Sequence, residues 1–172
     1  MAADNFNACL KFTLQFEGGF VDNPKDPGGA TNLGVTQGTL SMFLGRHATL
    51  EEVKALTPQK VAPIYKLKFW DHVNGDDLPI GVDLAVFDFG VHSGPARGAM
   101  GLQRALGLAD DGKVGPVTLL AANAADPRRL INDICDERLA FLKQLKVFQS
   151  FKAGLTNRVA NCRDAAESML DK

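Results

Sequence analysis

Apolar positions along the chain repeat mostly at helical spacing. A stripe near the N-terminus predicts a first helix, which Gly18-Gly19 ends directly after Glu17. Residues 79–92 are so apolar that we expect a central buried helix there, and Asp126-Pro127 opens a long helix further on. The other helix starts are predicted by capping residues or prolines, at Thr36, Thr49, Pro58, Pro95, Pro116 and Thr156 or Asn157.

Residues 20–35 interrupt this helical pattern. Two short β-tolerant pieces, Phe20-Val21 and residues 33–35, flank the turn signal NPKDPGG at residues 23–29. One small hairpin or ordered loop is therefore expected near the N-terminus. The fold class that results is mainly α (α+β), with residues 1–78 and 79–172 as two lobes packed in one compact unit.

The composition and net charge of the chain limit the kinds of partner that we expect it to bind. The chain has 172 residues, 45% of them hydrophobic and 23% charged, which is typical of a globular protein. A net charge of −1 gives no field that attracts nucleic acid, and no apolar run approaches the roughly 20 residues of a membrane span. We expect a monomer with neither a nucleic-acid partner nor stable membrane insertion. The first thirty residues lack a signal-peptide pattern, so we expect synthesis in the cytoplasm.

The candidate chemistry can be narrowed by elimination. No H-E-x-x-H motif occurs, and the three cysteines lack the spacing of metal ligands, so no cofactor is expected. Neither a G-x-S-x-G elbow nor a P-loop is present. Carboxylates remain as the candidates for acid–base catalysis.

Glu17 has the environment of a general acid. Phe16 and Phe20 flank it, and a helix C-terminus precedes the glycines, so apolar neighbours and the helix dipole both disfavour its charged form. Cleavage of a glycosidic bond needs such an acid, together with a second carboxylate or a positioned water. Asp26 would stay ionised in its turn, and Thr31 could orient the water. The alternative is that Glu17 is a solvated residue at a helix end and Asp26 only shapes the turn before Pro27.

Residues 17–36 (EGGFVDNPKDPGGATNLGVT) closely resemble the E-G-G-[YF]-x-x-x-P-x-D-P-G-G-x-T-x-x-G-[IV]-T signature of glycoside hydrolase family 108, the lysozyme-like N-acetylmuramidases of bacteria and phage endolysins. YKLKFWD at residues 65–71 resembles the family's Y-x-x-[FY]-W. Residues 85–121 are similar to its helical peptidoglycan-binding region, including the D-G-x-[IV]-G-P-x-T turn. The resemblance spans roughly residues 8–163.

This resemblance implies a lysozyme-like helical fold, in which residues 1–78 are the catalytic glycoside hydrolase lobe and residues 79–172 are a helical peptidoglycan-binding-like lobe. It also implies a role for particular residues. The catalytic glutamate of the family falls on Glu17, and the aspartate and threonine of its D-P-G-G-x-T motif fall on Asp26 and Thr31. Residues expected to contact the glycan strand are Tyr65, Trp70 and Asn32. By pattern alone, Tyr65 and Trp70 at helical spacing are also typical of a packed core.

The implied activity is hydrolysis of the β-1,4 bond between N-acetylmuramic acid and N-acetylglucosamine in peptidoglycan glycan strands. An endolysin of this kind would act on the wall in the periplasm after release by a holin. Alternatives are a lytic transglycosylase and a non-catalytic peptidoglycan-binding or secretion accessory protein. Two residues depart from the family pattern: His92 stands where Asn is expected, and Leu155 where Trp is frequent.

Overall fold

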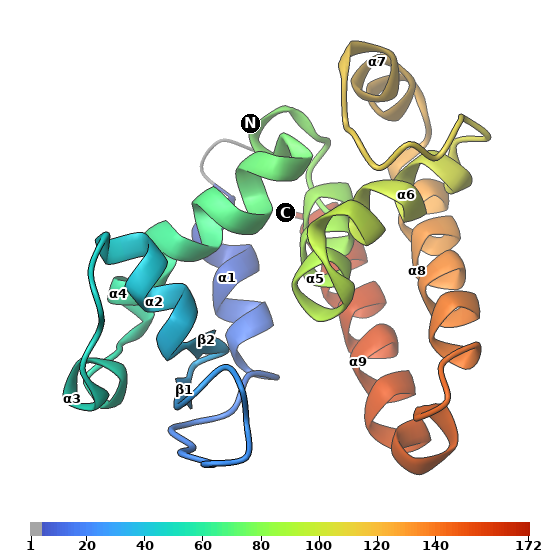
Figure 1. Cartoon of the computed structure of the whole chain (residues 1–172). Coiled ribbons are helices and arrows are strands. Elements are labelled where there is room, and N and C mark those ends of the chain that lie inside the picture. Colours follow the sequence, from blue (N-terminus) through green and yellow to red (C-terminus); the bar gives the residue numbers. More distant parts are fainter. Residues whose placement is uncertain (1–4) are drawn as a thin grey trace. The chain divides into compact units, whose positions relative to one another are not determined.

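A computed structural model describes residues 5–172 and divides the chain into two compact units (Figure 1). Residues 10–67 form one unit, and the N-terminal residues up to Cys9 join residues 68–172 in the other. Helices dominate the described residues, and a small antiparallel sheet of two strands lies in the first unit. The expected mainly α fold with one small hairpin is thereby confirmed. A functional division at residue 78 stays a prediction.

The unit of residues 10–67 contains the sheet and several short helices. Thr36 accepts a hydrogen bond from the backbone N–H of Thr39, and Thr49 and Glu52 form a reciprocal capping box. These caps start their helices at the predicted residues. The elements are α1 (Phe6–Leu14), β1 (Thr31–Asn32), β2 (Val35–Thr36), α2 (Gln37–Leu44), α3 (Leu50–Lys54) and α4 (Pro58–Tyr65), of which α1 begins in the other unit.

The first helix ends earlier than predicted. Its last α-helical residue is Leu14, whereas the sequence pattern places the end at Glu17. The N–H groups of residues 15, 16 and 17 donate to carbonyls only three residues back, at 3.1, 3.1 and 3.3 Å. Glu17 therefore lies in a tightened turn that follows the helix, a common way to satisfy the last carbonyls of an α-helix.

The unit that contains residues 68–172 is built around α5, which is buried over most of its length, as predicted for residues 79–92. Helices α6, α8 and α9 pack against it. Small residues allow α6 to approach closely, since a Cβ on Gly98 would lie 2.6 Å from the Val86 carbonyl oxygen. The elements are η2 (Lys66–Trp70, a π-helical turn), η3 (Asp71–Val73), η4 (Gly75–Asp77), α5 (Val82–Ser93), α6 (Pro95–Ala105), α7 (Pro116–Ala124), α8 (Pro127–Lys143) and α9 (Phe148–Met169), of which η2 begins in the other unit.

One buried residue of helix α5 forms ion pairs with two arginines in the core. Asp88, fully buried, accepts hydrogen bonds from Arg138 of α8 at 2.8 Å and from Arg158 of α9 at 2.9 and 3.2 Å. The two guanidinium groups hold the pKa of Asp88 below its ordinary value although burial opposes them. Asp88 therefore has a structural role, in which it links α5 to α8 and α9.

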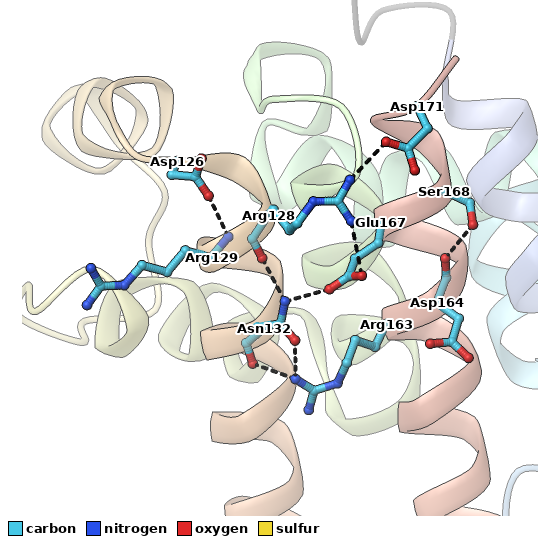
Figure 2. Close-up of polar contacts among 9 residues, drawn as sticks. All are labelled: Asp126, Arg128, Arg129, Asn132, Arg163, Asp164, Glu167, Ser168 and Asp171. Atoms are coloured by element: carbon cyan, nitrogen blue, oxygen red, sulfur yellow. Dashed lines mark hydrogen bonds and ion pairs between the residues drawn. The ribbon is translucent and has the colours of Figure 1, made fainter.

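Helices α8 and α9 are also joined by a row of exposed and half-buried polar contacts (Figure 2). Arg128 pairs with Glu167 and Asp171, and Asn132 hydrogen-bonds both Glu167 and Arg163. Helix α9 is longer than predicted. It begins at Phe148, eight residues before Thr156, and the chain bends at Phe151, where φ is −122° and ψ is 19°. The predicted cap at Thr156 or Asn157 is therefore wrong.

Candidate active site

The backbone beside Glu17 is tied to the hairpin. Glu17 itself is half-buried, and the carbonyl of the next residue, Gly18, accepts a hydrogen bond of 3.0 Å from the N–H of Leu33. Leu33 lies in the turn between the two strands. The turn after α1 and the hairpin turn are thus fixed to each other beside Glu17, through two residues that lie fifteen positions apart in the sequence.

The hairpin has its tight turn at Leu33-Gly34, not at the NPKDPGG segment. Strand β1 pairs with β2 in antiparallel register, Thr31 opposite Thr36, across this two-residue turn. Both turn residues have positive φ, 51° for Leu33 and 74° for Gly34, the signature of a type I′ turn. Thr31 pairs in addition with Val21 through two backbone hydrogen bonds of 2.8 Å, which close the loop at residues 23–29.

Tyr65 brings a third element to the same turn. Its hydroxyl donates a 2.8 Å hydrogen bond to the Leu33 carbonyl, and its side chain is only 2% exposed. A Cβ added to Gly34 would collide with the Tyr65 hydroxyl and would lie 2.8 Å from Oε2 of Glu17. The carboxyl of Glu17 and the hydroxyl of Tyr65 therefore face the same small space beside the Gly34 backbone. Sequence reasoning named Glu17 and Tyr65 but missed Leu33 and Gly34.

Asp26 lies on the exposed loop that precedes the hairpin. Its Oδ1 accepts a 2.9 Å hydrogen bond from the N–H of Gly28, and its carbonyl accepts one from Gly29. These are the contacts of an Asx-turn. Thr31 is half-buried in β1. The structure accounts for Asp26 as a turn residue, and catalytic roles for Asp26 and Thr31 stay predictions.

The other two expected glycan contacts have buried side chains. The Asn32 amide donates to the carbonyls of Val53 and Lys54, at 3.0 and 3.2 Å, and so satisfies the C-terminal end of α3. Trp70 is fully buried, and its Nε1 donates a 2.8 Å hydrogen bond to Asp76. These contacts give Asn32 a capping role and Trp70 a packing role, and contact of either with glycan stays a prediction.

The Trp70 ring belongs to an aromatic cluster. It makes edge-on contacts with Phe6 and Phe87, at centroid separations of 5.3 and 5.5 Å. Such pairs add roughly 0.5–1.5 kcal/mol beyond the area they bury. The cluster therefore joins the start of α1 to α5 within one unit.

A cavity of about 520 Å³ lies elsewhere in the unit of residues 10–67. It is formed by α2, α3, the residues that follow α3, and α4, and its surface is mostly apolar. The predicted catalytic and glycan-binding residues are not among those that line it, which are Leu40, Phe43, Leu44, Glu51, Glu52, Ala55, Leu56 and Lys60. This cavity is therefore distinct from the space between Glu17 and Tyr65.

Within the described residues, no helix is both long and apolar enough to cross a membrane.

Two protein-family models match this chain, one in each half. The family model described as glycosyl hydrolase 108 matches residues 10–94, which include Glu17, the hairpin and Tyr65. The family model described as a predicted peptidoglycan domain matches residues 97–158. Curated proteins gave no match.

A solved structure, that of Brucella abortus SagA, is similar over nearly the whole length. It is 47% identical, with 96% of this chain and 95% of that chain covered, and the TM-score is 0.83. The similarity in sequence and in fold therefore extends through both matched regions. The chain belongs to the glycosyl hydrolase 108 family, and is a peptidoglycan hydrolase with a C-terminal peptidoglycan domain.

Proposed function

We propose that this protein is an N-acetylmuramidase, which hydrolyses the β-1,4 bond between N-acetylmuramic acid and N-acetylglucosamine. The observation that supports cleavage of a glycosidic bond most is the position of Glu17, between the end of α1 and the hairpin turn, with its carboxyl beside the Gly34 backbone. A carboxyl in this position is suited to protonate the oxygen of a glycosidic bond.

In the proposed reaction, Glu17 donates its proton to the bridging oxygen as the bond to the anomeric carbon breaks. Water attacks that carbon, and a base takes the proton that the water loses. Asp26 is the proposed base, with Thr31 orienting the water. We favour inversion of the anomeric configuration, which leaves room for a water between two carboxyl groups roughly 6.5–9.5 Å apart, whereas retention needs roughly 5–5.5 Å.

The products of wall digestion test the reaction type. Purified protein is incubated with peptidoglycan, the fragments are separated, and their masses are measured by mass spectrometry. Hydrolysis at the proposed bond yields reducing N-acetylmuramic acid ends. Anhydro-muramic ends would show a lytic transglycosylase, reducing N-acetylglucosamine ends would show the other glycosidic bond, and an intact polymer would show a wall-binding or secretion accessory protein.

The role of Glu17 has its own test. Glu17→Gln keeps the shape of the side chain but cannot donate the proton, so we expect folding and wall binding to persist while hydrolysis is nearly abolished. Turbidity loss of a cell-wall suspension measures the activity, and pull-down with insoluble peptidoglycan measures binding. A purified variant with wild-type turbidity loss removes Glu17 from the reaction.

We propose further that the biological setting is host lysis by a phage or prophage, with the enzyme reaching the periplasm through a holin. The resemblance of residues 17–36 to phage endolysins supports this setting. Expression with and without a holin tests it, with optical density and cell fractionation as readouts. Accumulation in the periplasm without any lysis partner counts against it.

A further inference from the structure

We infer that the Leu33-Gly34 turn positions the carboxyl of Glu17, and that residue 34 must lack a Cβ because Glu17 and Tyr65 occupy that space. This inference rests on the proposed function, in which Glu17 is the acid. It assigns a role to a turn of the signature that follows Glu17 only after a long loop in the sequence.

The first observation is backbone strain at Leu33. A leucine with φ of 51° is in the left-handed region, where its Cβ crowds the backbone, and type I′ turns strongly prefer Asn or Gly there. Such a conformation persists only when neighbouring groups determine it. Both backbone groups of Leu33 are held: its N–H donates to Gly18, the residue after Glu17, and its carbonyl accepts from Tyr65.

The second observation is the space at Gly34. A Cβ there would overlap the Tyr65 hydroxyl and come within 2.8 Å of Oε2 and 3.2 Å of Cδ of Glu17. Tyr65 is 2% exposed, so its ring has little freedom to withdraw. The Glu17 carboxyl ends a flexible side chain, so it is the group that yields more readily. An added methyl group therefore displaces the carboxyl, and its overlap with the Tyr65 hydroxyl lowers stability as well.

The chain offers a matched control at Gly45. Gly45 ends α2 with φ of 70°, close to the 74° of Gly34, and a Cβ there would meet nothing within 4 Å. Ala at either position therefore imposes the same backbone strain. The two substitutions differ in what the new methyl group meets: Glu17 and Tyr65 at residue 34, and nothing within 4 Å at residue 45.

The experiment compares wild type, Gly34→Ala, Gly45→Ala, Tyr65→Phe and the Gly34→Ala/Tyr65→Phe double variant. For each, kcat and KM are measured on soluble peptidoglycan fragments, and Tm is measured by circular dichroism. We expect Tm to fall further for Gly34→Ala than for Gly45→Ala, because only the first substitution crowds Tyr65. We also expect kcat to fall roughly 100-fold, with KM little changed, for Gly34→Ala alone, as a displaced reacting group produces. We expect Gly34→Ala to lower kcat less in the Tyr65→Phe background, because part of the obstruction is gone.

Equal kcat values for Gly34→Ala and Gly45→Ala overturn the inference, whether or not Glu17→Gln is inactive. A crystal structure of Gly34→Ala gives a second answer that does not depend on activity: a Glu17 carboxyl in its wild-type position contradicts the inference, and a displaced one supports it. If Gly34→Ala does not fold, the double variant is used for both measurements. An active Glu17→Gln variant, by contrast, refutes the proposed function and leaves the structural readout of the positioning role intact.

Discussion

The buried carboxylate of Asp88, in α5, gives the most quantitative prediction. In Asp88→Asn the side chain keeps its size but loses its charge, so Arg138 and Arg158 lose the carboxylate that they share. The exposed fractions of the three side chains are 0% for Asp88, 1% for Arg138 and 8% for Arg158, so water does not replace it. Within residues 5–172, the Nε of Arg138 is already buried without a hydrogen-bond partner.

The magnitude follows from this burial. Removing one partner of a buried ion pair destabilises a protein by about 3–5 kcal/mol, since a charge is left uncompensated in the interior. For a chain of this length, 1 kcal/mol shifts Tm by about 2–4 °C, so the expected fall is roughly 6–20 °C. The wild-type pair also has a pH signature: the pKa of Asp88 is lowered on folding, so its contribution is present near neutral pH and is lost as the pH falls through that lowered pKa.

Thermal unfolding at neutral pH, followed by circular dichroism, measures the effect. Asp110→Asn is the control, because the Arg104–Asp110 pair is 2.6 Å long but its side chains are 43% and 42% exposed. Exposed pairs of this kind contribute at most about 1 kcal/mol. If Asp88→Asn melts within the few degrees expected for Asp110→Asn, the network of Asp88 is not what stabilises this unit.

Three further predictions concern the reaction and the acid response. EDTA leaves wall hydrolysis unchanged, because the proposed reaction uses carboxyl groups and water; inactivation that zinc reverses contradicts this. Burial, with the charges of Arg138 and Arg158, lowers the pKa of His92 from 6.5 to about 4, so stability is lost as pH falls from 6.5 towards 4. Between about pH 7 and pH 4.5, the free energy of unfolding measured with urea should fall less for His92→Asn than for the wild type. Equal falls would refute this role of His92. Asp26→Asn lowers kcat by roughly 10²–10⁴-fold with KM little changed; near-normal turnover in a variant that only melts earlier confines Asp26 to its turn.

Helix starts could be predicted from sequence because their causes are local. The caps at Thr36, Thr49 and Asp126 act within three residues, and proline at a first turn needs no distant partner. The buried helix α5 could also be predicted, because a helix that is apolar on all sides is stable only when it is buried. Within the described residues, these elements needed only short-range information.

The features that sequence could not supply depend on distant residues. Nothing near Asp88 in the chain indicates Arg138 or Arg158, which lie 50 and 70 residues away. The early start of α9 at Phe148, whose side chain is buried, is not indicated by the local cap signal at Thr156 either. Burial and tertiary contact, rather than local propensity, decide such features.

At the hairpin, local sequence preferences do not predict the position of the tight turn. By local preference the NPKDPGG segment is the strongest turn signal, and Leu33 is a poor residue for a type I′ turn. The tight turn nevertheless lies at Leu33-Gly34, because Gly18 and Tyr65, 15 and 32 residues away from Leu33, hold its two backbone groups. Sequence and structure are expected to disagree where strain serves a function. The turn that carries Glu17 and the turn at Gly34 are therefore two parts of one site, and Gly34→Ala should lower turnover by more than its loss of stability explains.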